Sequence, residues 1–211
     1  MQVAVSDVVD ADLDRWDAWR PDQVARLLAG VRAPWAVAAG WSIDLFLGGQ
    51  RREHEDLEIA VPGDRFAEIG EAFPDCDFFL PLGDGSERLR RLDPAGELLA
   101  THHQTWARER STGKWRLDVF REPFAEGLWV CRRDEALRLP YEEVILRTAD
   151  GIPFQRPEIT LLFKAKHARP RDDADLAAVL PALEPERRAW LAEWLQRIHP
   201  GHRWLARIRA P

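Results

Sequence analysis

The sequence predicts a mixed α/β portion of about 150 residues followed by a helical portion of about 55 residues. Short apolar stretches with Pro or Gly boundaries recur up to the segment Gly151-Ile152-Pro153, and one of them alternates strictly between apolar and other residues. After this segment the apolar residues follow helical spacing. We therefore expect an α/β domain over residues 1–153 and a small helical lobe, packed on it, over residues 154–211.

The N-terminal part of the chain predicts a helix, a strand and a second helix. Residues 12–31 have helical spacing that is interrupted near Pro21 and ended by a glycine. Residues 34–39 form a short apolar run, which predicts a buried strand, and Gly40 then predicts a turn. We expect the next helix over residues 42–47.

The segment 55–61 predicts a half-buried strand with two carboxylates on one face. Every second residue of this segment is apolar, so these residues share the face that turns to a core. Asp56 and Glu58 lie on the opposite face, roughly 7 Å apart along the strand, where they repel each other unless a cation compensates them. A divalent metal ion is one such cation.

The remaining elements are short in the α/β portion and longer in the helical portion. Asp64 is expected to cap a helix over residues 65–73. Further strands are expected at residues 76–82, 114–120, 129–131 and 144–147, with one or two more between residues 83 and 113. Helices are expected at residues 157–166, 172–183, 185–198 and 202–208.

The composition describes a globular protein and excludes several classes. A net charge of -6 argues against a general nucleic-acid binder, which needs a basic surface. No apolar run approaches the ~18 residues that a membrane span requires, and the acidic N-terminus lacks a signal-peptide pattern. Cys76 and Cys131 are isolated, which is typical of a reducing compartment. We therefore expect a cytoplasmic protein without a membrane segment.

Three elements together predict a phosphoryl-transfer site. Gly40 at a strand-to-helix turn lets a phosphate approach the backbone, and the helix that begins near Ser42 supplies N–H donors. Asp118 is the lone acid within the apolar stretch of a predicted strand. Together with Asp56 and Glu58 it completes a set of three carboxylates, which is how two metal ions about 3.5–4 Å apart are held in many such sites.

Lysine usage adds two candidates for binding a nucleotide. Only three of the 30 basic residues are lysines, and two of these, Lys164 and Lys166, lie in one predicted helix. A lysine can neutralise the charge of a triphosphate during phosphoryl transfer. Because residues two apart do not share a helical face, we expect Lys164 to point into the cleft and Lys166 to be solvated.

These motifs in combination resemble a known superfamily. Gly40-Trp41, the segment 52–58 (Arg-x-His-x-Asp-Leu-Glu) and the segment 117–119 (Leu-Asp-Val) resemble the DNA polymerase β-like nucleotidyltransferases. Within that superfamily the chain is most similar to the aminoglycoside 2''-adenylyltransferase and lincosamide nucleotidyltransferase group, whose second conserved block the segment 157–175 resembles. The resemblance covers roughly residues 35–183.

The resemblance implies both a fold and a reaction. The implied fold is a twisted mixed sheet with helices on one side, followed by a helical C-terminal lobe. The implied reaction is transfer of a nucleoside monophosphate from ATP or another NTP to a hydroxyl of a small molecule, with Mg²⁺, in two ions, as cofactor and pyrophosphate as product. An aminoglycoside-type antibiotic is the leading acceptor, and the acidic net charge is compatible with a cationic one.

The resemblance also assigns roles to individual residues. Asp56 and Glu58 are implied metal ligands, and Asp118 is implied as the third metal-binding carboxylate and the catalytic base. Gly40, Ser42, Lys164 and Lys166 are the candidate nucleotide-binding residues. Two positions depart from the family pattern: Trp41 follows Gly40 where the family usually has Gly or Ser, and Glu58 stands where the family more often has Asp.

Other interpretations of the same residues are open. The strand carboxylates have Arg51 and Arg52 as alternative partners, and Asp118 has Arg116 and Arg121. His54 suits either a phosphate contact or a structural role. The acidic residues at the start of the helix predicted near residue 172 are expected to complement the dipole of that helix. A contact with the substrate is the alternative.

Two further functions compete with the leading one. A toxin-like transferase acting on tRNA would need a basic surface beside the cleft, for which the candidates are Arg88, Arg90, Arg91, Arg108 and Arg110. A catalytically silent nucleotide-binding domain is the other, suggested by the two departures from the family pattern. Nucleic acid is therefore the less favoured partner, and a small hydroxyl acceptor with an NTP the favoured pair.

Overall fold

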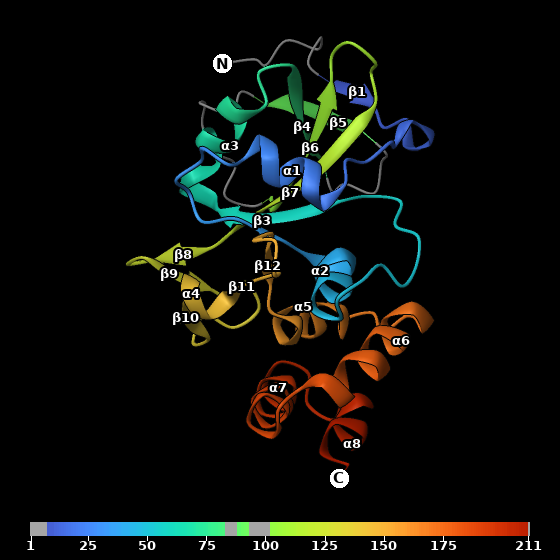
Figure 1. The fold of residues 1–211 in the computed structure, drawn as a ribbon, viewed down its shortest axis with the longest axis vertical. Helices are drawn as coiled ribbons and strands as arrows, with labels where there is room; N and C mark the ends of the chain where they lie inside the picture. The colour runs from blue at the N-terminus through green and yellow to red at the C-terminus, as the bar shows by residue number, and fades with distance from the viewer. Residues whose placement is uncertain (1–7, 83–87, 93–101, 211) are drawn as a thin grey trace.

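A nine-stranded mixed sheet forms the centre of the molecule in the computed structural model, which describes residues 8–82, 88–92 and 102–210 (Figure 1). The strand order is β1-β5-β4-β6-β7-β3-β2-β12-β11. Its strands are β1 Val8–Asp10, β2 Ala36–Val37, β3 Glu58–Pro62, β4 Cys76–Pro81, β5 Arg88–Leu92, β6 Gln104–Glu109, β7 Trp115–Glu122, β11 Ile145–Arg147 and β12 Pro153–Gln155. The pairs β3–β7 and β2–β12 are parallel, and the other neighbours are antiparallel.

One face of the central strands is buried under two helices. Helices α1 (Pro21–Leu27) and α3 (Phe66–Ala72) contribute Val24 and Phe66 to one apolar cluster with the sheet. Ile59 on β3 and Val119 on β7 belong to the same cluster and are fully buried. The alternation of strand side chains then turns the intervening residues of β3 and β7 to the opposite face.

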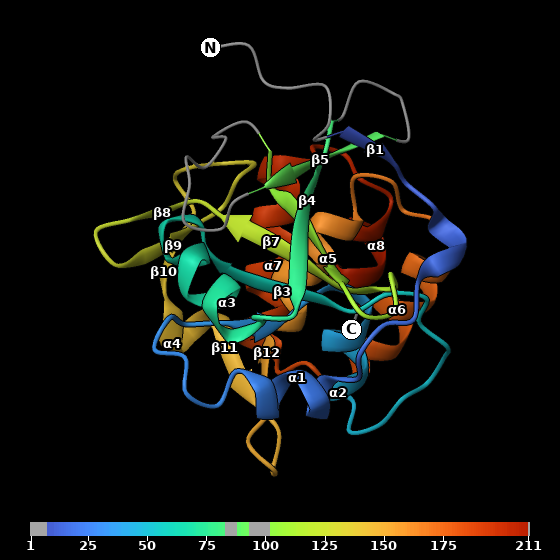
Figure 2. The same ribbon diagram turned by 90° about the horizontal axis from the view of Figure 1, so that it is seen from above.

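The opposite side of the sheet carries the remaining helices (Figures 1 and 2). Helices α2 (Ala39–Phe46) and α5 (Pro157–Lys164) lie next to the sheet, and α6 (Pro170–Val179), α7 (Pro185–Ile198) and α8 (Trp204–Arg209) follow below them in Figure 1. A second apolar cluster joins α5 to these last helices, with Leu191 and Leu195 of α7 fully buried at helical spacing. A small sheet of β8 (Phe124–Ala125), β9 (Leu128–Val130) and β10 (Arg138–Pro140) and the short helix α4 (Tyr141–Val144) complete the fold, with 3-10 turns at Leu13–Arg15, Gly63–Arg65 and Leu180–Ala182.

The predicted mixed α/β fold with a mixed sheet is confirmed, and most predicted elements have a counterpart, but helices cover both faces of the sheet and not one side as the resemblance implied. Helix α7 has the predicted bounds, and β4, β7, β9 and β11 lie within one or two residues of the predicted strands. Of the predicted stretch 83–113, residues 83–87 and 93–101 lie outside the described residues, and β5 and β6 fall in the rest. The division into domains at residues 153 and 154 stays a prediction.

Three local predictions were wrong. Between residues 12 and 31 the chain forms a 3-10 turn and the short helix α1, because Pro21 can only begin a helix there. Helix α2 begins at Ala39, so Gly40 lies in its first turn and not in a turn before it. Asp64 does not cap α3, because it belongs to a 3-10 turn and the residue at the N-cap is Arg65, which makes no side-chain capping bond.

Two further features concern the length of the helices and the state of the cysteines. No helix within residues 8–82, 88–92 and 102–210 has both the length and the apolar character that crossing a membrane requires. Cys76 and Cys131 are both buried and free.

Candidate functional site

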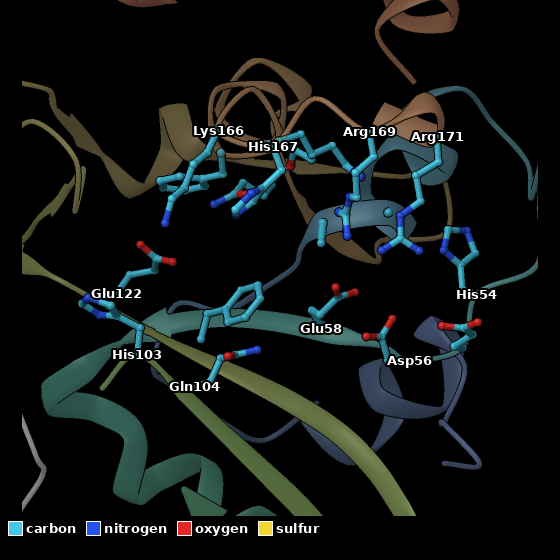
Figure 3. Close-up of a pocket in the computed structure, with 18 of the residues that line it drawn as sticks. His54, Asp56, Glu58, His103, Gln104, Glu122, Lys166, His167, Arg169 and Arg171 are labelled. Atoms are coloured by element: carbon cyan, nitrogen blue, oxygen red, sulfur yellow. The ribbon is translucent and has the colours of Figure 1, made fainter. Parts of the chain in front are cut away.

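A cavity of about 830 Å³ lies between the sheet and the turn that joins α5 to α6 (Figure 3). We call its sheet side the floor, which carries Asp56, Glu58, Gln104 and Glu122. We call the opposite side the roof, which carries Lys166, His167, Arg169 and Arg171. The predicted site residues that line the cavity are Gly40, Asp56, Glu58, Lys164 and Lys166.

The parallel pairing of β3 with β7 brings the three predicted carboxylates together. Glu58 lies directly opposite Asp118 in the register, and Asp56 lies two residues before the start of β3. Burial raises the pKa of Glu58 well above its usual value, and the charges of Asp56 and Asp118 raise it further. Burial is also the main cause that raises the pKa of Asp118 to about 7. The floor therefore holds a group of acids whose mutual repulsion is compensated only in part by nearby cations such as Lys164 and Arg52.

Asp118 has little to balance its charge. Its side chain is 3% exposed, and its Oδ2 accepts a hydrogen bond of 2.8 Å from Gln104 Nε2. Its Oδ1 is buried and has no hydrogen-bond partner in the described part of the chain. The alternative partners are engaged elsewhere, because Arg116 pairs with Asp17 and Glu109 and Arg121 donates to the carbonyl of His102. The interpretation of Asp118 as an arginine-paired strand acid is therefore wrong.

Gly40 is required by a close approach at the start of α2. A Cβ atom at this position would lie 2.8 Å from the ring of His54 and would also collide with the guanidinium of Arg52. The preceding residue, Ala39, has a left-handed backbone with φ of 48°, which is unusual for a residue with a side chain. Backbone strain of this kind is typical of functional sites.

Ser42 does not line the cavity, although the sequence made it a candidate for nucleotide binding. Its hydroxyl is fully buried and lies 2.8 Å from both the carbonyl of Ala39 and the hydroxyl of Thr160. Because α2 begins at Ala39, residue 42 is on the second half of the first turn, where its side chain joins α2 to α5. We therefore leave Ser42 out of the proposed site.

His54 has a structural partner, and this explains Trp41. The His54 Nε2 atom lies 2.7 Å from Asp44 Oδ2, and each of these side chains is 2% exposed. The His54 ring stacks on Trp41 with ring centroids 4.5 Å apart. Burial lowers the pKa of His54, and the hydrogen bond to Asp44 partly opposes this. Trp41, a departure from the family pattern, thus supports a histidine beside the cavity.

Both lysines line the cavity, which differs from the expectation that Lys164 alone points into it, while Lys166 is exposed to solvent as expected. Lys164 is the last residue of α5 and its Nζ lies 3.0 Å from carboxylates of both Asp172 and Asp175. Lys166 lies beyond the end of the helix, where helical spacing no longer separates the two side chains. Asp172 also accepts from the backbone N–H of Arg169, which confirms its capping role at the start of α6.

Several cavity residues were not predicted from the sequence. Glu122 shares a face of β7 with Asp118, so strand alternation could have found it. Its carboxylate is 2% exposed, its Oε1 lies 2.7 Å from Arg132 Nη1, and its Oε2 has no hydrogen-bond partner among the described residues. Burial raises the pKa of Glu122, and the charge of Arg132 opposes this. Other lining residues that were not predicted as site residues include His102, His103, Gln104, Arg132, Arg133, His167, Arg169 and Arg171.

The floor carboxylates fit a divalent cation in their chemistry. Mg²⁺ prefers hard oxygen donors, and Asp56, Glu58 and Asp118 supply these with a charge that nearby cations offset only in part and with one unpartnered oxygen. Across residues 8–82, 88–92 and 102–210, no group of three or more His, Cys, Asp or Glu side chains already surrounds a metal position.

Comparisons with known proteins agree with this geometry. Residues 22–124 match the family model described as aminoglycoside-2''-adenylyltransferase, a range that includes Gly40, Asp56, Glu58 and Asp118. A solution structure of the antibiotic-resistance factor ANT(2'')-Ia is similar with a TM-score of 0.54 and 15% identity, covering 83% of this chain and 89% of that one. A crystal structure of ANT(2'')-Ia in complex with adenylyl-2''-tobramycin is similar with a TM-score of 0.53 and 15% identity, covering 84% and 97%.

One curated relative carries a different name. A protein of Saccharomonospora viridis, named 1D-myo-inositol 2-acetamido-2-deoxy-alpha-D-glucopyranoside deacetylase, is 29% identical over 178 residues. The match covers 77% of this chain and 66% of the length of that relative. The match of residues 22–124 to this family model and the shared fold confirm the resemblance found in the sequence.

Proposed function

We propose that this protein is a Mg²⁺-dependent nucleotidyltransferase that moves a nucleoside monophosphate, in the simplest case AMP from ATP, to a hydroxyl of a small molecule. The observation that carries the proposal is the strand register that pairs Glu58, which lines a cavity with a cationic roof, with Asp118, which is buried beside it and is not one of the lining residues. The family description supports adenylyl transfer, and the fold neighbour solved with adenylyl-2''-tobramycin is consistent with it. The description of the matching family makes an aminoglycoside-type antibiotic the first acceptor to test. A cytoplasmic location stays a prediction.

Asp56, Glu58 and Asp118 are the residues that would hold Mg²⁺. When bound there, the ion supplies neutralisation of the triphosphate charge and lowers the pKa of the attacking hydroxyl. Glu58 lines the cavity despite its longer side chain, so this departure from the family pattern leaves a carboxylate where a ligand is needed.

The residues around the start of α2 form a place for the phosphates. Gly40 leaves the backbone open, and Arg52, Lys164 and Arg171 line the cavity near it. Lys164 is held by two carboxylates of α6, so its ammonium group is fixed in position. These cations neutralise the triphosphate and the pyrophosphate that leaves.

We assign to Asp118 the role of accepting the proton of the acceptor hydroxyl. The support is that its Oδ1 has no hydrogen-bond partner among the described residues. Gln104 holds the other oxygen and so orients the carboxylate. The hydroxyl oxygen bonds to the α-phosphorus, the bond to the bridging oxygen of the β-phosphate breaks, the proton passes to Asp118, and pyrophosphate leaves.

The arginines that a tRNA-binding surface would require give the tRNA alternative little support. Asp77 pairs with Arg91 at 2.7 Å and with Arg110 at 3.2 Å. Arg108 lies over the ring of Phe79, 4.4 Å from its centroid. These cations are largely engaged within the protein and lie away from the residues that line the cavity.

The test is a pyrophosphate-release screen with ATP, GTP, CTP and UTP over a panel of hydroxylated antibiotics, with Mg²⁺ or with EDTA. We expect release that needs Mg²⁺ and an acceptor and that Asp118→Asn abolishes. Labelling of tRNA in preference to any small molecule would favour the toxin-like alternative. Absence of both Mg²⁺-dependent NTP binding and pyrophosphate release, in a folded preparation, would show a silent domain.

A further inference from the structure

We infer that the acceptor carries an anionic group, a carboxylate or a phosphate, beside its hydroxyl, and is not a polycation. This inference rests on the proposed function and names the acceptor class of that site. It follows from where the acceptor must lie and from the charge of the side chains there.

The position of the acceptor follows from the geometry of phosphoryl transfer. Gly40, Arg52 and Arg171 place the phosphates at the Asp56 end of the cavity, and Figure 3 shows Arg171 and Asp56 on the same side. In phosphoryl transfer the attacking and leaving oxygens lie roughly in line on opposite sides of the phosphorus. With pyrophosphate leaving toward the Asp56 end, the acceptor lies on the other side of Asp118, toward Glu122.

The Glu122 end lies within reach of a small acceptor. Asp118 and Glu122 are four residues apart on the same face of β7, which is about 13 Å along a strand. His103, Arg132, Arg133 and Lys166 also line the cavity at this end, and together with Glu122 we call them the acceptor end. Figure 3 shows Glu122, His103 and Lys166 grouped on one side of the cavity, away from Asp56.

The acceptor end has an excess of positive charge. Its three cations face one carboxylate, and that carboxylate is already paired with Arg132 at 2.7 Å. Arg133 donates to the carbonyls of Leu162 and Phe163, at 3.1 and 2.9 Å, and has no carboxylate partner among the described residues. Lys166 is exposed and forms no hydrogen bond or ion pair within the described part of the chain.

This local charge outweighs the charge of the whole chain. The net charge of -6 is spread over the molecule, whereas a bound acceptor meets the side chains that line the cavity. The exposed acids Glu53 and Glu55 belong to the Asp56 end. A polycationic acceptor would bring ammonium groups against Lys166 and Arg133, whereas a carboxylate or phosphate would pair with them. The expectation of a cationic acceptor from net charge therefore does not apply at this site.

The test measures equilibrium binding, so it does not depend on catalysis. Four probes are titrated into the full-length protein with Mg²⁺ and a non-hydrolysable ATP analogue: gluconate, glucose 6-phosphate, glucose and tobramycin. We expect gluconate or glucose 6-phosphate to bind about tenfold more tightly than tobramycin, and the stronger of the two identifies the anionic group. Gluconate and glucose 6-phosphate should each also bind more tightly than glucose.

A charge-reversed pair of variants locates the effect. Lys166→Glu should weaken binding of the acid by about tenfold and strengthen binding of tobramycin, because it reverses the charge at an exposed position that supports no other contact. Lys114→Glu makes the same change of charge outside the cavity and should leave both affinities unchanged. Thermal unfolding of both variants checks that they fold.

Two failures can be told apart. Tighter binding of tobramycin than of both acids, no binding of either acid, or equal effects of Lys166→Glu and Lys114→Glu would overturn the inference. If the same preparation does not bind the ATP analogue with Mg²⁺, the proposed function itself has failed.

Discussion

Two deeply buried carboxylates in this protein differ in how they are paired. Glu158 on α5 is fully buried and accepts hydrogen bonds from Arg156 at 2.9 Å and from Arg187 at 2.7 Å. Burial alone would raise the pKa of Glu158, but the hydrogen bonds from Arg187 and Arg156 bring it below its usual value. Asp118 is buried almost as completely, has Gln104 as its described hydrogen-bond partner, and has a pKa of about 7.

The difference separates a carboxylate that holds the fold from one that is available for chemistry. Two arginines compensate Glu158 and connect α5 to α7. At the floor of the cavity the repulsion among Asp56, Glu58 and Asp118 is left without an equal compensation, which lowers stability locally. Sites that bind a cation or move a proton are commonly built in this way.

The largest expected effect is on activity. Asp118→Asn keeps the shape and the contact with Gln104 but removes the proton acceptor, so kcat for nucleotidyl transfer should fall at least about a hundredfold. The free energy of unfolding of the metal-free protein should stay the same or rise, because one of three repelling charges is gone. Pyrophosphate release and thermal unfolding measure the two quantities. Full activity of the variant would show that Asp118 is not the third carboxylate.

The corresponding change at Glu158 should have the opposite pattern. Glu158→Gln leaves Arg156 and Arg187 without their counter-charge, and we expect the free energy of unfolding to fall by about 2 kcal/mol. The kcat of the folded fraction should be unchanged. Denaturant titration compares the variant with Glu142→Gln, which makes the same change at an exposed position. A loss of activity without a loss of stability would contradict the structural role.

The two carboxylates should also respond to pH with opposite sign. Because the pKa of Glu158 is lowered on folding, its contribution to stability is present above about pH 4.5 and is lost as pH falls through its folded pKa. The pKa of Asp118 is raised from 3.8 to about 7, so the folded protein retains a proton in this range and stability falls as pH rises through it. Unfolding of metal-free wild type and Asp118→Asn in EDTA between pH 3.8 and about 7 should show a steeper fall of stability in wild type, because Glu58 and Glu122, whose pKa values are also raised, are present in both proteins. Equal slopes would show that Asp118 titrates normally.

The smallest expected effect is that of a substitution at Ser42, which does not line the cavity. Ser42→Ala removes a hydrogen bond between α2 and α5 and should cost about 1 kcal/mol of unfolding free energy. Thr160 keeps Gln155 as a partner at 3.2 Å, which limits the loss. The KM for the NTP and kcat should be unchanged. A rise of KM by tenfold or more would restore Ser42 as a nucleotide-binding residue.

The strand alternation and the helix boundaries could be predicted because they are local. Every second residue from Leu57 to Val61 is buried as expected, and the bounds of α7 follow from Pro185 and the apolar spacing after it. The proximity of Asp118 to Glu58 was predicted from two observations. Asp118 is the lone acid in its strand, and its segment resembles the family motif. The register between β3 and β7 agrees with it.

The remaining site residues could not be predicted because their placement depends on distant parts of the chain. Arg132 is held beside the cavity by its hydrogen bond to Glu122, which is ten residues earlier in the chain. The hydroxyl of Ser42 pairs with that of Thr160, which is 118 residues later, and so does not face the cavity. The start of α2 was misplaced because Ala39 adopts a left-handed backbone, for which an alanine gives no signal. Such positions are fixed by tertiary contacts and carry no local pattern.

The turn between α5 and α6 has a consequence for how this protein can diversify. The segment 165–169, in which Ala168 has a φ of 44°, and the first residues of α6 supply Lys166, His167, Arg169 and Arg171 to the roof. Four potential charges thus come from six consecutive positions that lie apart from the strands bearing the carboxylates. Substitutions within this short stretch can change which acceptor molecules bind, while the carboxylates of the reacting centre stay the same. Relatives can therefore share a reaction and differ in the molecules that they modify.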